Sequence, residues 1–201
     1  EITVLKEIGA SAIAMQETNT NWNKNNMYER AKKLFMRAWN NTKLQTSNYK
    51  ENMRTEYQSG GTALCVTGKY VSKVCNSGSD HMGRWSWVTI KGKKDHKITL
   101  LSAYRVCENT LAQAGPQTCW LQQWKVLKKT GYSNPDPSRQ FYTDLNKFID
   151  TQLEKNEELI ITMDANDKKG KDTNLQKFLD KHDLLDAHEQ LHRHCTPPNT
   201  H

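Results

Sequence analysis

Residues 158–167 read Glu-Leu-Ile-Ile-Thr-Met-Asp-Ala-Asn-Asp, an apolar run that switches abruptly to carboxylates and an amide. The run predicts a buried strand over Glu158–Met163. Two other predicted buried strands end in the same manner, Ala10–Gln16 before Glu17-Thr18-Asn19 and Lys97–Ala103 before Tyr104-Arg105. Ligands of α/β sheets bind beyond the carboxyl ends of the strands. If the three strands are neighbours, the polar residues that follow them meet in one cleft.

The rest of the chain alternates between helix and strand patterns. Helices are predicted at Glu1–Ile8, Met27–Trp39, Gln117–Lys129, Pro137–Glu154 and Asp172–Lys181. Further strands are predicted at Gly61–Thr67, Tyr70–Cys75 and Arg84–Lys91. Strands in pairs, interleaved with helices, indicate the α/β class. The length of 201 residues favours a single domain over residues 1–201.

The composition excludes several classes of protein. Hydrophobic residues make up 35% of the chain, and no apolar run approaches the ~20 residues that span a bilayer, so no membrane partner is expected. Six Trp residues and several apolar runs exclude a disordered chain. The net charge of +7 favours a polyanionic partner such as nucleic acid. Five cysteines without a CxxC pair favour a reducing, intracellular compartment.

The residues at the strand ends suit metal-assisted hydrolysis of phosphate esters. Mg²⁺ is typically held by one or two carboxylates together with water and substrate phosphate oxygens, and Glu17 is the predicted carboxylate ligand. Asp164 is predicted to orient or deprotonate the attacking water as a general base. Asn166 is predicted to hydrogen-bond a phosphate oxygen or the carboxylate of Asp164.

Three more side chains are candidates for the same site or for its support. Tyr104, backed by Arg84 or Arg105, would stabilise charge that develops in the transition state. The alternative for Tyr104 is a half-buried residue that anchors a strand end. Arg105 is interpreted as a surface or salt-bridge residue rather than a catalytic one.

These residues belong to five motifs that occur in the order of the endonuclease/exonuclease/phosphatase superfamily, and the resemblance extends over most of the chain. The motifs are Gln16-Glu17-Thr18, Gly60-Gly61-Thr62, Gly83-Arg84, Ser102-Ala103-Tyr104-Arg105 and Asp164-Ala165-Asn166. Two further features resemble the endonuclease domains of non-LTR retrotransposon polyproteins. One is Gly83-Arg84-Trp85-Ser86-Trp87, and the other is a helical or loop insert at residues 108–136, around Gln122-Gln123-Trp124 and Asn134-Pro135-Asp136-Pro137.

The resemblance implies a four-layer α/β/β/α sandwich with two packed mixed sheets, and Mg²⁺-dependent cleavage of DNA, with Mn²⁺ as an alternative cofactor. It makes Glu17 the metal ligand, Asp164 the residue that orients water and Asn166 the phosphate contact. Tyr104 matches the Tyr of the third motif, and Arg84 matches the Arg that supports the site. A retroelement polyprotein as the parent would add the nucleus as an option for location.

The resemblance also implies that the domain is incomplete. The family's first Asn-bearing strand is expected before Glu1, and its last Asp and final Asp-His pair beyond His201. On that expectation the chain is a truncated segment of a larger protein, with weak activity or none. Two alternatives stay open: an enzyme of the same fold that acts on lipid or RNA, and a non-catalytic nucleic-acid-binding remnant.

Overall fold

The computed structural model describes residues 2–50, 55–168 and 170–192. The chain forms two compact units, Glu1–Asn166 and Asp167–His201. The first unit holds every strand named below together with α1 to α4, and therefore all five candidate site residues. The second unit holds α5 (Asn174–Lys181) and α6 (Ala187–Leu191). The predicted single domain with an insert at 108–136 stays a prediction.

Seven strands of the first unit form two sheets. One sheet has the order β1-β3-β2 and is antiparallel throughout, with β1 (Ala12–Gln16), β2 (Thr42–Ser47) and β3 (Thr62–Thr67). The other has the order β4-β5-β6-β7, with β4 (Val74–Ser79), β5 (Trp85–Lys91), β6 (Lys97–Tyr104) and β7 (Glu157–Asp164). Its last pair, β6 and β7, is parallel, so this second sheet is mixed as predicted, whereas the first sheet, also predicted to be mixed, is purely antiparallel.

The two sheets pack face to face, and β3 is buried along its whole length. Alternate side chains of β3 point to opposite faces. Ala63 and Cys65 join a core cluster with Phe35 of α2 (Met27–Ala38). Leu64 and Val66 instead pack against the second sheet through Val88. β3 therefore contributes to two cores, one under a helix and one between the sheets.

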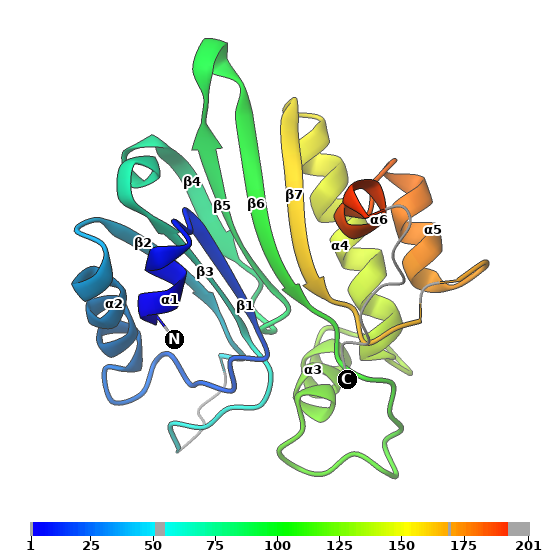
Figure 1. The fold of residues 1–201 in the computed structure, drawn as a ribbon. Coiled ribbons are helices and arrows are strands. Elements are labelled where there is room, and N and C mark those ends of the chain that lie inside the picture. Colours follow the sequence, from blue (N-terminus) through cyan, green and yellow to red (C-terminus); the bar gives the residue numbers. More distant parts are fainter. Residues whose placement is uncertain (1, 51–54, 169, 193–201) are drawn as a thin grey trace. The chain divides into compact units, whose positions relative to one another are not determined.

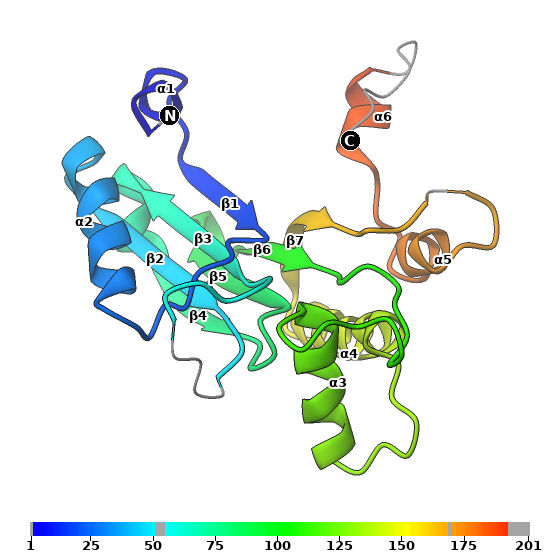
Figure 2. The same ribbon diagram turned by 90° about the horizontal axis from the view of Figure 1, so that it is seen from below.

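Helices cover the outer faces of both sheets. Figures 1 and 2 show α2 and α4 (Pro137–Leu153) on opposite sides of the paired sheets. On the α4 side, Trp85 packs edge-on against Phe141, with ring centroids 6.0 Å apart. Burial of such aromatic faces is the main favourable term in docking a helix on a sheet. The layers are therefore helix, sheet, sheet and helix, which confirms the predicted sandwich.

The helices begin where the sequence provides caps. Asp136 precedes α4, and its Oδ1 accepts from the backbone N–H groups of Ser138 at 3.0 Å and Arg139 at 3.2 Å. Pro137 occupies the first helical position, where its missing N–H costs nothing. α3 (Cys119–Lys129) begins two residues later than predicted because the Thr118 side chain caps it. α1 (Ile2–Glu7) and α2 lie within their predicted ranges, with Glu1 outside the described residues.

Two segments of the first unit differ from the sequence prediction. A 3₁₀ helix spans Gly68–Lys73 where a strand was predicted to begin at Tyr70, and β4 follows it. β4, Val-Cys-Asn-Ser-Gly-Ser, has little apolar character. Its Gly78 lies opposite Trp87, whose ring would be 2.2 Å from a Cβ at that glycine. β2 was not predicted at all, since its sequence Thr-Lys-Leu-Gln-Thr-Ser is mostly polar.

Within the described ranges, none of the helices has the length and apolar character that a membrane span requires.

Candidate active site

The carboxyl ends of β1, β6 and β7 lie at the same rim of the two sheets (Figure 1). Gln16, the last residue of β1, reaches the second sheet: its Nε2 donates to Ser102 Oγ at 3.0 Å and to the Thr162 carbonyl oxygen at 3.3 Å. Ser102 Oγ in turn donates to the Met15 carbonyl oxygen at 3.0 Å. These bonds hold the end of β1 against β6 and β7.

Side-chain alternation then places three predicted site residues together. The residues of β6 and β7 that Gln16 contacts face β1, and Tyr104 and Asp164 stand two positions further along the same strands. Because every second residue of a strand points the same way, both also face β1. The strand register pairs Tyr104 with Asp164. The Tyr104 hydroxyl donates to Glu17 Oε1 at 3.3 Å, so Glu17, Tyr104 and Asp164 share one rim.

The backbone at Glu17 is held in an uncommon conformation. Glu17 and Asn19 both have φ of 50°, in the left-handed region that residues with a Cβ rarely adopt. A pair of glycines fixes this turn: Thr18 N donates to the Gly61 carbonyl at 3.1 Å, and Gly60 N donates to Asn19 Oδ1 at 2.9 Å. Strain of this kind persists only where the surrounding structure enforces it, and it clusters at functional sites.

Close contacts explain why position 60, at this point of the rim, is a glycine. Its φ is 81°, and a Cβ there would lie 2.4 Å from Cys119 Sγ and 3.4 Å from Tyr104 Cε1. The loop backbone, the first residue of α3 and the Tyr104 ring are therefore in direct contact. Any larger side chain would push the turn that carries Glu17 away from Tyr104.

Asn166 follows β7 in a tight turn that is bonded to β6. Its backbone N donates to Asp164 Oδ1 at 3.2 Å, and its Nδ2 donates to the Arg105 carbonyl oxygen at 2.7 Å. The φ of Asn166 is 40°, again left-handed. The side-chain amide of Asn166 thus holds the turn to the neighbouring strand, while Asn166 itself is exposed at the rim. Its predicted phosphate contact stays a prediction.

Arg105 supports the site from a buried position, and sequence reasoning anticipated the support but not the burial. It was expected on the surface or in a salt bridge; it does pair with Glu108 at 3.2 Å, but the residue is only 1% exposed. Its Nη1 donates to the carbonyl oxygens of Ala165 at 3.3 Å and Asn166 at 2.7 Å, and its Nε donates to that of Ser138 at 3.0 Å. Arg105 therefore fixes the turn after Asp164 against α4. A signal was present, because this cation follows a buried strand directly.

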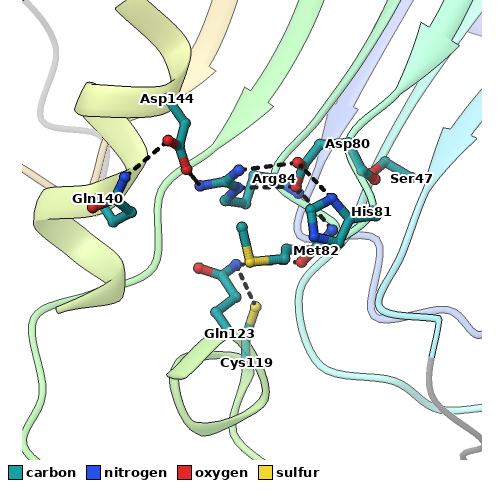
Figure 3. Close-up of polar contacts among 9 residues, drawn as sticks. All are labelled: Ser47, Asp80, His81, Met82, Arg84, Cys119, Gln123, Gln140 and Asp144. Carbon is teal, nitrogen blue, oxygen red and sulfur yellow. Dashed lines mark hydrogen bonds and ion pairs between the residues drawn. The ribbon is translucent and has the colours of Figure 1, made fainter. Parts of the chain in front are cut away.

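Arg84 is buried beside the rim rather than open to it. Figure 3 shows its guanidinium between Asp80 and Asp144. Arg84 Nε and Nη2 donate to the two oxygens of Asp80 at 2.9 and 3.0 Å, and Nη1 donates to Asp144 Oδ2 at 2.7 Å. The Arg84 carbonyl oxygen accepts from Tyr104 N at 2.7 Å. Arg84 therefore supports the backbone of Tyr104 from behind. The predicted effect of Arg84 on the reaction stays a prediction.

The ion pair sets the protonation of the buried acid. Burial alone would raise the pKa of Asp80, but the charge and the hydrogen bonds of Arg84 outweigh it, and the pKa is lowered from 3.8. Burial alone would lower the pKa of Arg84, but the carboxylates of Asp80 and Asp144 raise it. Both groups are thus charged at neutral pH, and Asp144 adds a second carboxylate to the cation (Figure 3).

Burial also fixes the state of Tyr104. Desolvation, followed by the nearby Cys119 and Glu17, raises the pKa of the Tyr104 phenol. Tyr104 is therefore a neutral O–H donor throughout the working range of pH, and it can orient Glu17 or a substrate oxygen but cannot act as a base. Burial raises the pKa of Cys119 to about 12, so this thiol is an uncharged packing group and not a nucleophile.

The donor chemistry of the rim is compatible with Mg²⁺. Within residues 2–50, 55–168 and 170–192, no group of three or more His, Cys, Asp or Glu side chains is arranged to enclose a metal ion. Glu17 is exposed and uses Oε1 for Tyr104, which leaves its other oxygen available. A single carboxylate at an open rim suits a hard cation whose remaining ligands are water and phosphate oxygens.

The fold is a four-layer sandwich of two packed sheets between helical layers. Among solved structures, the human Nocturnin catalytic domain with bound sulfate anion shares it, with a TM-score of 0.52 and 12% sequence identity. The match covers 94% of this chain and 64% of that one. At this identity the similarity establishes the fold. No family model and no curated protein matches the chain.

Proposed function

We propose that this chain belongs to a metal-dependent phosphodiester hydrolase, with DNA as the substrate. The observation that carries the proposal is the convergence of Glu17, Tyr104 and Asp164 at one rim, through the 3.3 Å hydrogen bond and the pairing of β6 with β7. Segments far apart in the sequence supply these residues, and structural needs alone do not call for two carboxylates and a phenol at one strand edge. Bound Mg²⁺ would neutralise phosphate charge and polarise the P–O bond.

The chain's own residues have distinct roles in this proposal. Glu17 contributes the carboxylate for the cation, and Tyr104 holds that carboxylate in place by donating to it. Asp164 lies on the neighbouring strand, half-buried, where its carboxylate can accept a proton from the attacking water. Asn166 fixes the turn that orients Asp164. Arg84 and Arg105 are positioning residues, since their guanidinium groups bond to protein oxygens.

The net charge of +7 suits every polyanionic phosphodiester, and the choice of DNA among them rests on the sequence resemblance. The finer proposal, an endonuclease domain of a nuclear retroelement polyprotein, rests on the sequence resemblance of Gly83-Arg84-Trp85-Ser86-Trp87. Sulfate has the tetrahedral shape and charge of a phosphate group, and its presence on the Nocturnin fold is compatible with an oxyanion substrate.

The test is a single-turnover assay with the chain in excess over supercoiled plasmid, labelled RNA or a phosphoinositide, because an excess of protein makes slow cleavage measurable. Plasmid nicking that requires Mg²⁺ or Mn²⁺ is expected. Glu17→Gln should raise the Mg²⁺ concentration for the half-maximal rate by at least about 10-fold, since it removes the charged ligand. The matched control is Glu158→Gln, which neutralises an exposed carboxylate at the opposite end of β7.

Each other outcome has a distinct meaning. Cleavage of RNA or lipid with plasmid left intact would replace DNA as the substrate and retain the site. DNA binding without metal-dependent turnover would favour the non-catalytic remnant. Nicking that Glu17→Gln and Glu158→Gln affect equally would show that the site assignment is wrong.

A further inference from the structure

The outer face of α2 carries a basic stripe, defined as Arg30, Lys33 and Arg37. These residues are three and four positions apart, so they share one face of the helix. All three are exposed, and together with Leu34 they line one shallow surface hollow. Seven residues of helix at 1.5 Å each separate the first cation from the last by about 10 Å. The stripe thus presents a line of cations on the scale of a phosphate backbone.

Hydrogen bonds and one weak ion pair connect this stripe to the rim that carries Glu17. Beyond the turn at Glu17, Asn21 N donates to the Glu56 carbonyl oxygen at 2.8 Å. The side chain of Glu56 then accepts from Asn25 Nδ2 at 2.7 Å and lies 3.8 Å from Arg30 Nη1. Four extended residues span at most roughly 13 Å, so the path from Glu17 to Asn21 is short. The stripe therefore begins close to the rim (Figures 1 and 2 show the segment that joins β1 to α2).

One exposed aromatic side chain lies on this path. Tyr57 follows Glu56 and is 53% exposed. Its backbone is fixed by a bridge to Thr20 and by the bond from Thr55 Oγ1 to its carbonyl oxygen at 2.9 Å. Nucleic-acid grooves commonly combine cations with such aromatic faces. Tyr57 therefore lies between the rim, through its bridge to Thr20, and the basic stripe, through the neighbouring Glu56. The rim, Tyr57 and the basic stripe are together called the basic surface.

We propose that this surface binds the phosphate backbone of the DNA on the flank of the cleaved bond, with Lys33 and Arg37 as the contacts furthest from the rim. The inference rests on the proposed function and names the part of the chain that holds the substrate. Charge complementarity selects the occupant: Arg30 is weakly paired to Glu56, with their side chains 64% and 46% exposed, and no ion pair is found for Lys33 or Arg37 within the described ranges.

A membrane fits this face less well than DNA. A helix that lies on a lipid surface needs a continuous apolar face turned outward. The apolar side of α2 is turned inward, where Phe35, Ala31 and Tyr28 pack on the first sheet. Leu34 is the one apolar residue that lines the hollow among the three cations. We therefore assign the surface to a polyanion with phosphates along its length.

The test measures binding of a fluorescein-labelled 30-base-pair duplex by anisotropy in EDTA, where no turnover occurs. Lys33→Glu/Arg37→Glu should weaken binding at least about 10-fold and reduce the slope of log affinity against log salt by about 1.8, because two phosphate contacts are lost. The matched control is Lys93→Glu/Lys94→Glu, which makes the same change in net charge at the exposed turn between β5 and β6. Glu56→Gln removes a competing carboxylate and should tighten binding.

Equal weakening by the stripe and control variants would overturn the proposal, as would a wild-type chain that fails to bind DNA. So would stripe variants that lose binding to phosphatidylserine vesicles while their DNA binding is unchanged. The two proposals fail separately: stripe-dependent binding without metal-dependent nicking contradicts only the proposed function. Glu17-dependent nicking with stripe and control variants that bind alike contradicts only the inference about α2.

Discussion

Asp164→Asn is expected to lower the rate of DNA cleavage by about 100- to 10,000-fold, the usual contribution of a positioned general base. The substitution keeps the size of the side chain and an oxygen that can still accept from Asn166 N, now at 3.2 Å from Asp164 Oδ1. It removes the charge that can take a proton from water. The fold and DNA binding in EDTA should therefore be unchanged while the chemical step is slowed.

The control for this loss is the same change of carboxylate to amide elsewhere on the strand. Glu158→Gln should nick plasmid at the wild-type rate, because Glu158 is exposed and lies near the amino end of β7. Nicking is measured under single-turnover conditions at saturating Mg²⁺, so that metal affinity does not enter the comparison. An Asp164→Asn chain as active as Glu158→Gln would remove Asp164 from the reaction.

Arg84→Ala is expected to lower the free energy of unfolding by about 3–5 kcal/mol, the usual cost of removing one partner of a buried ion pair. The side chains of Arg84 and Asp80 are 4% and 5% exposed, so the substitution leaves a buried carboxylate without its cation. Asp144, 23% exposed, retains some access to water. The loss also removes the contact of the guanidinium with the Trp85 ring, 4.5 Å from its centroid.

Urea denaturation measures this effect, and Arg30→Ala is the matched control. Arg30 and Glu56 form an exposed pair at 3.8 Å, which contributes at most about 1 kcal/mol.

The stability that the pair of Arg84 with Asp80 contributes should depend on pH. The pKa of Asp80 in the folded chain is below its ordinary value of 3.8. The ion pair's contribution to the free energy of unfolding is therefore fully present above pH 3.8, and it is lost as the pH falls through the pKa of the folded state. The difference in free energy of unfolding between wild type and Arg84→Ala should become smaller below about pH 4. A difference that does not change with pH would argue against the ion pair.

The rim could be predicted from the sequence because each of its residues stands at the end of an apolar run that forms a strand. The prediction that these strands are buried was wrong for β1 and β7, in which only Ile13 and Glu157 are buried. The apolar runs before Glu17 and Asp164 fix where these strands end, and the parallel pairing of β6 with β7 then places Tyr104 beside Asp164. Because side chains alternate along a strand, Tyr104 and Asp164 both face β1. The structure confirms the predicted sandwich, whereas the catalytic roles of these residues stay predictions.

Other features could not be read from local patterns. Arg84 and Asp144 are separated by 60 positions, and a motif containing Gly83-Arg84 gives no sign that its cation is buried between two acids. β2 buries only Leu44 and Ser47 among its six residues, so it lacks the alternation of a typical half-buried strand. In both cases the deciding contacts are tertiary, and local propensity has little influence.

The central claim is that Glu17 and Asp164 face one cation at a shared rim, and paramagnetic relaxation by Mn²⁺ tests it most directly. On the isotopically labelled chain, Mn²⁺ at substoichiometric concentration should selectively broaden the NMR signals of Glu17, Tyr104 and Asp164. The signal of Lys94, in the turn between β5 and β6, should stay sharp, and Glu17→Gln should abolish the broadening. Broadening that is absent from Asp164, or that is centred on another part of the chain, would contradict the account.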